Sequence, residues 1–434
     1  MPVMRASPRQ PGERSPGALL TPTLAQGVLI SMALLLAAGL LGGWVAERLR
    51  LPDIVVYLVV GILLGPGVTG WIQAPAGSVG SQIVFVAGAA LLLYEGAREV
   101  RLTELRRIWL TVTMLSTIGL VAGALVVAAL GVWLLHLPFP MALLLAAVIS
   151  PTDPASIVPV LRHVAVTPKL AQTVVAESAL NDATAATLAV VVLGAAGGGA
   201  DIWWRGLLTF AASSLGGLAV GVAVAVAAIY ALSGAVGGAP RVVRQEHGPI
   251  LALLTAFGAY LLAERLGASG FMAVFAAGVV HGNADILRLL PRPPTQPPGQ
   301  TDRGFSAVTG DLMRMAVFVL LGTQVKFDSL ANIGPAALLT GALVVVARPV
   351  TVLLSVLPDR AAHWRWPEIG FLLWVRETGV IAAVLAGILA GNGVAGSSLI
   401  ASTVVLAALV TLLGQGSTTA AIARRLGVGA QVPE

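Results

Sequence analysis

Long apolar runs separated by short polar connectors extend along almost the whole chain. A helix needs about 20 mainly apolar residues to cross a bilayer, and thirteen candidate spans can be laid along the sequence. They are expected at residues 23–46, 53–71, 80–97, 108–135, 139–161, 170–195, 206–233, 247–263, 267–282, 311–326, 333–357, 367–391 and 396–421. The pattern therefore predicts an all-α polytopic membrane protein with about 13 transmembrane helices.

The polar stretches between these spans are short, with one exception. Residues 282–310 contain Pro-Arg-Pro-Pro-Thr-Gln-Pro-Pro and are expected to form an extended, mobile loop. An N-terminal tail is predicted over 1–22, one transmembrane domain over 23–421 and a short C-terminal tail over 422–434. No attached soluble domain is expected after the last span.

Composition and charge agree with this organisation. Only 11% of the residues are charged and 57% are hydrophobic, whereas a soluble protein carries roughly 25% charged residues. The net charge of +6 does not indicate nucleic-acid binding, because the basic residues lie mainly in the connectors. With the N-terminus outside and the C-terminus inside, 18 of them fall on the inner side and 6 on the outer side. That bias predicts this orientation.

A weak internal repeat relates the two halves. The segment 86–105 can be laid beside 317–330, since each ends an apolar run with Gly, a polar segment and Leu before the next long span. The first repeat is expected at about 53–195 and the second at about 311–421. The span with Asp153 then corresponds to the span with Arg376, and the two copies have opposite orientations, as in transporters with inverted repeats.

Charged residues inside apolar spans are the main candidates for function. An unpaired charge at the centre of a bilayer costs about 2.5–3.5 kcal/mol even on a lenient scale. Five acids and two bases lie within or at the edges of the spans: Glu95, Asp153, Glu177, Asp182, Glu377, Arg348 and Arg376. The acids outnumber the bases, which favours a cation site. The sequence leaves open which acids pair with the arginines.

Pro151 and Pro154 bracket Thr152 and Asp153 in the middle of an apolar run. Proline removes a backbone donor and clashes with the preceding turn, so the helix is expected to be broken here. Freed carbonyl groups and the Thr152 hydroxyl could then coordinate a cation, and Asp153 could offset the positive end of a half-helix. The alternative is a simple proline kink.

The next span carries polar residues at helical spacing. Glu177 and Asn181 are four residues apart, as are Ser178 and Asp182, so they form two neighbouring columns on a helix. Such oxygen ligands suit sodium, potassium or lithium better than a transition metal. A carboxylate that binds either a proton or a metal cation provides a mechanism for exchange. Asn181 cannot titrate, so this pair offers one exchangeable charge.

Together these motifs resemble the monovalent cation/proton antiporter family, in its sodium/proton exchanger branch. The resemblance rests on Ser-Pro-Thr152-Asp153-Pro and Glu177-Ser-Ala-Leu-Asn181-Asp182, and it extends over most of the chain. Further matching segments are Leu51–Pro66, Leu-Leu-Leu-Tyr-Glu95-Gly, Gly270–Gly278, and Gly414-Gln-Gly with the Arg424-Arg425 segment near the end.

The resemblance implies roles for individual residues. Asp182 would alternate between cation and proton, and it would share the cation site with Thr152, Asp153 and Ser178 where two unwound helices cross. Glu177 would be held by Arg376, and Glu95 would pair with Arg348. Many exchangers of this branch have Gly directly after the arginine, whereas this chain has Glu377, which could compete for Arg376.

The resemblance also implies a transporter rather than an enzyme, with no cofactor besides the transported ions. A core domain would move against a scaffold domain that forms a homodimer, in a bacterial inner membrane. The Asn-Asp form is associated with electroneutral exchange of one cation for one proton, sodium being the first expectation and potassium the second. Two alternatives are a channel-like potassium efflux protein of the same superfamily and, remotely, an intramembrane aspartyl protease. The first usually carries a regulatory C-terminal domain, and the second has Tyr-Asp and Gly-x-Gly-Asp motifs that this sequence lacks.

Overall fold

The computed structural model of this chain describes residues 24–49, 51–153, 166–195, 202–233, 241–287, 289, 300–325 and 333–428. Within these ranges all regular secondary structure is helical, with no β-strand. Seven of the helical stretches are long and apolar enough to cross a membrane, and four shorter helices are also apolar. The prediction of an all-α membrane protein is confirmed.

The helices fall into two halves joined by a middle group. The first half contains α1 (Leu24–Leu49), α2 (Asp53–Leu64), α3 (Val79–Arg98), α4 (Leu102–Met114), α5 (Leu120–Leu135), α6 (Phe139–Ile149) and α8 (Pro168–Ala195). The middle group is α9 (Ile202–Ser233), α10 (Arg241–Arg265) and α11 (Gly270–Gly282). The second half contains α12 (Gln300–Thr323), α13 (Ile333–Ala342), α14 (Arg348–Val356), α15 (Trp366–Trp374), α16 (Val380–Gly391), α17 (Ser397–Thr411) and α18 (Ser417–Leu426). Each of the thirteen expected spans overlaps at least one of these helices.

Some boundaries differ from the predicted ones. Helix α12 begins at Gln300, so the expectation of a loop over 282–310 is wrong from that residue onward. Helix α2 ends at Leu64, short of the expected 71, because Pro66 lacks a backbone donor and restricts Gly65 before it. The last helix continues to Leu426, beyond the expected 421.

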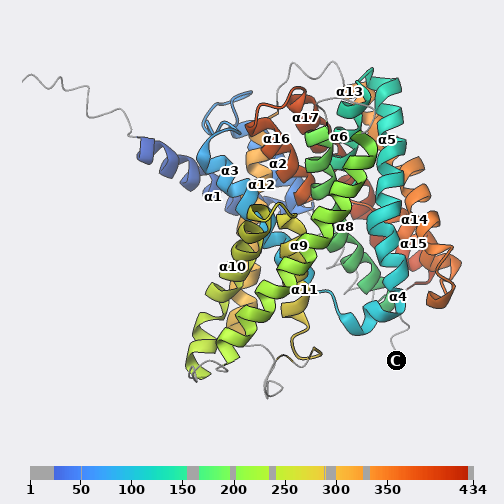
Figure 1. Ribbon diagram of the computed structural model, residues 1–434. Coiled ribbons are helices and arrows are strands. Elements are labelled where there is room, and N and C mark those ends of the chain that lie inside the picture. The colour runs from blue at the N-terminus through green and yellow to red at the C-terminus, as the bar shows by residue number, and fades with distance from the viewer. Residues whose placement is uncertain are drawn as a thin grey trace, which may run out of the picture.

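The two halves repeat one order of helices. In each half, a span interrupted by a π-helical turn precedes a span with a non-helical break, and a further long span follows. The π-helical turns are Leu115–Gly119 between α4 and α5, and Leu343–Ala347 between α13 and α14. In Figure 1, α4 lies below α5 whereas α13 lies above α14, so these two spans run in opposite directions. The order and the directions agree with the predicted inverted repeat, while its limits at 53–195 and 311–421 stay a prediction.

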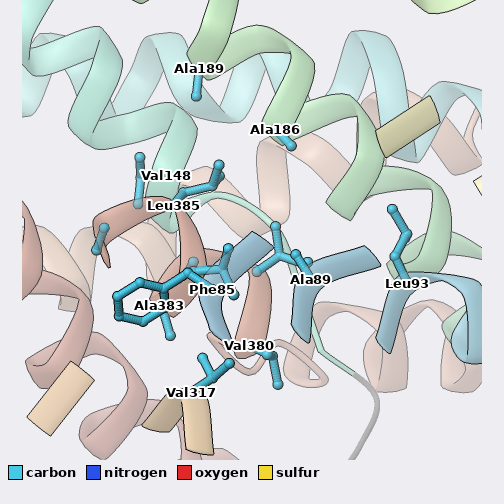
Figure 2. Packing of buried hydrophobic residues seen from close by; sticks show 14 of the residues in the cluster. Phe85, Ala89, Leu93, Val148, Ala186, Ala189, Val317, Val380, Ala383 and Leu385 are labelled. Carbon is cyan, nitrogen blue, oxygen red and sulfur yellow. The ribbon is translucent and has the colours of Figure 1, made fainter. Parts of the chain in front are cut away.

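Small side chains let the second half pack closely against the first. In Figure 2, Phe85 of α3 lies beside Ala383 of α16, in a cluster that also takes residues from α6, α8 and α12. A Cβ atom at Gly387 of α16 would come within 2.4 Å of the Phe85 ring. Only glycine permits this approach, and it brings the broken span of the second half into the apolar centre of the molecule.

Candidate functional site

The site is built where the two broken spans meet. The first break follows α6, which ends at Ile149, and it includes the non-helical residues 150–153. The second break is Val375–Gly379, between α15 and α16. Proline at 151 explains the first break, as predicted. Thr152 is described and Pro154 lies outside the described residues.

Hydrogen bonds join the two breaks directly. The amide of Asp153 donates to the carbonyl oxygen of Glu377 at 2.9 Å. The amide of Val380, the first residue of α16, donates to Oδ2 of Asp153 at 3.1 Å. The Asp153 carboxylate therefore lies at the positive N-terminal end of a half-helix, as the sequence predicts, and that half-helix belongs to the opposite half of the chain.

Glycine is required at this crossing. A Cβ atom at Gly379 would lie 2.0 Å from Cβ of Asp153 and 2.2 Å from its Oδ2. Real Cβ atoms essentially never show contacts this short, so any larger residue would push the two breaks apart.

Arg376 stabilises the crossing from the other side. Its Nη2 atom donates to the carbonyl oxygens of Ile149 at 2.5 Å and Ser150 at 3.2 Å, and Nη1 donates to the Thr378 hydroxyl at 3.2 Å. These carbonyls belong to the end of α6, where the helix presents its negative pole. The buried guanidinium group thus caps the half-helix of the first half.

The expected pairing of Glu177 with Arg376 is wrong. Glu177 forms a bidentate ion pair with Arg348, from Nη1 to Oε1 and from Nη2 to Oε2, the latter at 3.1 Å. Both side chains are almost fully buried, and Nε of Arg348 donates to the carbonyl of Leu372 at 2.9 Å. The bidentate geometry uses the fork of the guanidinium group and satisfies both carboxylate oxygens.

The expected pairing of Glu95 with Arg348 is also wrong. Glu95 lies near the end of α3 and pairs with Arg98 one helical turn later, with Nη1 to Oε1 at 3.0 Å. Both of these side chains are partly exposed. The structure thus separates Glu95 from the crossing.

Helix α8 presents its polar face to the first break. The Ser178 hydroxyl donates to the Thr152 carbonyl at 2.5 Å. Nδ2 of Asn181 donates to the Thr152 hydroxyl at 2.7 Å, and the Thr152 amide donates to Oδ1 of Asn181 at 3.3 Å. Thr152, Ser178 and Asn181 are therefore brought together; the family resemblance implied that Thr152 lies beside Ser178, while the contact of Asn181 with Thr152 was not predicted.

Asp182 differs from these neighbours. Among the described residues, no hydrogen bond or ion pair reaches its carboxylate, which is only partly buried. Asp153 lies close enough for the two charges to interact. Glu377 is buried, and its carbonyl oxygen accepts from the amide of Asp153, so these two acids are neighbours as well. Because the Glu177–Arg348 pair is internally neutral, the acids Asp153, Asp182 and Glu377 outnumber Arg376 at the crossing.

A small cavity lies behind Thr152 and Asn181. Its volume is about 20 Å³, and the two π-helical turns contribute to its wall. The polar lining residues are Ser150, Thr152, Glu177, Asn181, Arg348, Thr351 and Arg376. A water molecule needs about 10–15 Å³ and two to four polar partners, so the cavity suits one water between the ion pair and the first break.

Two polar contacts to the second break were missed in the sequence. The hydroxyl of Thr411, on α17, accepts from the amide of Thr378 at 3.0 Å. Nε2 of Gln415 donates to the carbonyl of Trp374, where α15 ends, at 2.5 Å. Gln415 lies in the Gly414-Gln-Gly segment of the family resemblance, so a signal for it existed, whereas Thr411 is one neutral residue in an apolar span.

Comparison with known proteins gives one matching family model, described as "Sodium/hydrogen exchanger, transmembrane", which covers residues 33–425. Among curated proteins, the chain is 25% identical over 388 residues to the K(+)/H(+) antiporter NhaP of Alkalimonas amylolytica. That match covers 88% of this chain and 64% of the relative. The chain therefore spans a little less than two thirds of that relative's length.

A second relative and a solved structure extend the comparison. The low-affinity Na(+)/H(+) antiporter NhaS1 of a Synechocystis strain is 26% identical over 418 residues, which cover 94% of this chain and 75% of that protein. The sodium proton antiporter MjNhaP1 from Methanocaldococcus jannaschii matches in structure with a TM-score of 0.74 at 24% identity. It covers 93% of this chain and 100% of that one, so the two share a fold.

Proposed function

This chain belongs to the sodium/hydrogen exchanger family, and from that premise we propose that it is a secondary transporter that exchanges a monovalent cation for a proton across a membrane. One observation carries the proposal. Asp182 is the acid at the crossing whose carboxylate has no hydrogen bond or ion pair within the described chain, while Glu177 is fully engaged by Arg348. A carboxylate without a fixed partner is available to a proton or to a cation.

The cation is proposed to bind Asp182 together with oxygen atoms of Thr152 and Ser178, with Asp153 adding negative charge. The Ser178 hydroxyl already holds the Thr152 carbonyl at 2.5 Å, and both groups are buried. Asn181 positions the Thr152 hydroxyl at 2.7 Å. Oxygen ligands of this kind suit alkali cations.

Proton and cation are proposed to compete for Asp182. As the pH falls, protonation removes the charge that holds the cation, so the half-saturating cation concentration rises. It rises by up to about tenfold per pH unit when both ligands use one carboxylate, by mass action. Because Asn181 is an amide, the site carries one exchangeable charge, which supports electroneutral exchange of one cation for one proton.

The other buried charges have supporting roles in this proposal. Arg348 compensates the negative charge of Glu177, and Arg376 caps α6 so that the crossing keeps its shape. Glu377 lies at the crossing, where its carbonyl oxygen accepts from the amide of Asp153, and it is assigned a supporting role there. Glu95 has no part in the site, because it pairs with Arg98 on α3.

Transport is proposed to follow alternating access, in which a core with both broken spans moves against a scaffold that forms a homodimer. An empty, deprotonated Asp182 resists that movement, because it would carry an unpaired charge through an apolar region. The protein is proposed to lie in a bacterial inner membrane with its N-terminus outside and its C-terminus inside, from the distribution of basic residues.

Sodium is the first candidate for the transported cation and potassium the second, because the relatives include antiporters named for each. Proteoliposomes with a pH dye inside test the proposal, with sodium, potassium and lithium added separately and the membrane potential clamped or free. Cation-driven proton movement that the clamp leaves unchanged supports electroneutral exchange and identifies the ion. Cation flux without proton counterflow contradicts the proposal and points to a channel.

A further inference from the structure

A groove opens beside the first turns of α4, on a part of the molecule that the proposed exchange does not use. Its volume is about 360 Å³, and it is lined by Leu102, Leu105, Arg106 and Trp109. We call these four residues the α4 groove. Arg106 and Trp109 are exposed, Trp109 by 59%, while Ile108 on the opposite side of the helix is fully buried. Its lining within the described residues thus consists of one charged and three apolar side chains.

Arg106 and its neighbour Arg107 have no ion-pair partner within the described chain. Glu104 is the acid of the same helix, and it lies outside ion-pair distance of both. Asp359, the acid of the turn that packs against α4, is already engaged. Asp359 is buried and accepts from the amide and the hydroxyl of Thr111 at 3.1 and 2.7 Å. Among the described residues, no acid therefore forms an ion pair with the arginine of the groove.

Further exposed arginines surround the same end of the molecule. Arg360 lies in a short helical turn that packs against α4, and Arg424 and Arg425 lie in the last turn of α18. Glu368, the acid of α15, is bound to Lys169 at 2.7 Å. Exposed tryptophans at 109 and 366 accompany these arginines, and tryptophan beside basic residues is typical of the level of lipid headgroups.

From this arrangement we propose that the α4 groove binds the headgroup of an anionic phospholipid. The guanidinium group of Arg106 would hold the phosphodiester, since its planar fork matches phosphate oxygens. Leu102, Leu105 and the Trp109 ring would contact the glycerol and the upper part of the acyl chains. A soluble anion would use the arginine alone and leave the three apolar side chains in contact with water.

The groove adjoins the link between α3 and α4. The side chain of Asn283 forms two hydrogen bonds to this link. Its Nδ2 atom donates to the Val100 carbonyl at 2.7 Å, and its Oδ1 atom accepts from the Leu102 amide at 3.0 Å. Arg101 donates through its amide to Gln172 of α8 and through Nη1 to the Gly282 carbonyl, both at 2.9 Å. A bound headgroup would thus hold the first turn of α4 where it joins α3, α8 and α11.

The test uses the full chain purified in detergent and titrated with phosphatidylglycerol or phosphatidylcholine, with bound lipid counted by native mass spectrometry. We expect the protein to retain phosphatidylglycerol under conditions that remove phosphatidylcholine. Arg106→Gln with Arg107→Gln should weaken this retention by about tenfold or more, the effect of losing one charge-assisted contact. Trp109→Ala should weaken it less.

The matched control is Arg424→Gln with Arg425→Gln, which removes the same charge from α18. This variant should retain phosphatidylglycerol like the unaltered chain. Equal retention in both double variants, or equal loss in both, overturns the α4 groove as the site. Displacement of the lipid by soluble glycerol 3-phosphate overturns the lipid assignment in favour of a free phosphate. Stabilisation supplies a second measurement: phosphatidylglycerol should raise the melting temperature of the control and leave that of the α4 variant unchanged.

Discussion

Both broken spans are interrupted by non-helical residues, but these residues carry different side chains. The first break, after α6, contains a proline and the acid Asp153, while the second, between α15 and α16, contains Arg376, Glu377 and Gly379. Each break is completed by the other half: Asp153 accepts from the first amide of α16, and Arg376 donates to the last carbonyls of α6. The inverted repeat thus supplies paired helix ends, and opposite charges from opposite halves stabilise them.

The helices behind the two breaks differ as well. Helix α8 faces the first break with Ser178, Asn181 and Asp182, whereas α17 and the turn after it face the second with the neutral residues Thr411 and Gln415. In the proposed mechanism, α8 therefore offers an exchangeable charge, whereas α17 and the turn after it offer only hydrogen bonds. This asymmetry predicts that substitutions behind the first break abolish transport, while equivalent ones behind the second mainly lower stability.

The largest expected effect is that of Asp182→Asn. The amide keeps the shape of the side chain but cannot exchange a proton for a cation, so proton-coupled cation uptake in proteoliposomes should disappear. Asp311→Asn on α12 is the matched control, because it changes an exposed acid bound weakly to Arg314 at 3.5 Å, and it should transport normally. Cation-driven proton movement that persists in the Asp182 variant contradicts the assigned role.

Next in size is the loss of the buried ion pair that connects the halves. Removing one partner of such a pair costs about 3–5 kcal/mol, because it leaves an uncompensated buried charge. Glu177→Gln should therefore destabilise the protein strongly, and adding Arg348→Gln should recover part of the loss. A double-mutant cycle on the free energy of unfolding measures this coupling.

The same cycle with Arg376→Gln distinguishes the two arginines. Its coupling to Glu177→Gln should be clearly smaller, because Arg376 donates to carbonyl groups of α6 and to Thr378. A larger coupling for Arg376 than for Arg348 would mean that the pairing expected from the family resemblance is correct after all.

The sequence predicts the spans and the first break because apolar length and proline are local signals, whereas the second break was expected only from the family resemblance. It also identifies the set of buried charges, since each is conspicuous in an apolar run. The pairing of those charges could not be predicted. Glu177 and Arg348 are 171 positions apart in the sequence. Counting acids against bases also assumes that each buried arginine pairs with a carboxylate. Arg376 instead uses backbone carbonyls that are available only because α6 ends beside it.

The expected end of the loop at residue 310 was wrong for a related reason. Proline-rich composition locates a polar connector, but it does not show where the next helix begins. Helix α12 starts at Gln300, and its later turns pack against α2 and α3. Packing against helices from a distant part of the sequence extends a helix beyond its apolar segment.

An intermediate effect is expected for Gly379→Ala at the crossing. The added methyl group would overlap with Asp153 at 2.0 Å, and overpacking of this kind typically costs about 1–3 kcal/mol. Gly258→Ala on α10 is the control, since no heavy atom lies within 4 Å of its Cβ position. The Gly379 variant should show a lower melting temperature and reduced exchange, while the Gly258 variant should match or slightly exceed the unaltered protein. Equal behaviour of the two variants would show that the breaks do not need this close contact.

The smallest expected effect concerns Thr411, the neutral residue of α17 that contacts the second break. The Thr411 hydroxyl donates to the Ala407 carbonyl within α17 and accepts from the Thr378 amide of the second break. Thr403, eight positions earlier, is equally buried and makes only the equivalent bond within the helix, to Leu399. Thr411→Val and Thr403→Val therefore lose the same intrahelical bond, and Thr411→Val alone leaves a buried amide unsatisfied, at a cost of about 1–3 kcal/mol.

Melting temperatures of the two valine variants give that difference directly, and exchange assays should show proton coupling in both. A lower melting temperature for Thr411→Val with coupling intact supports a structural second break beside a functional first one. If Thr411→Val abolished exchange as completely as Asp182→Asn, the second break would be part of the ion path. The distinction between a functional first break and a structural second break would then be wrong, because a neutral hydrogen bond would be as necessary for transport as the exchangeable carboxylate.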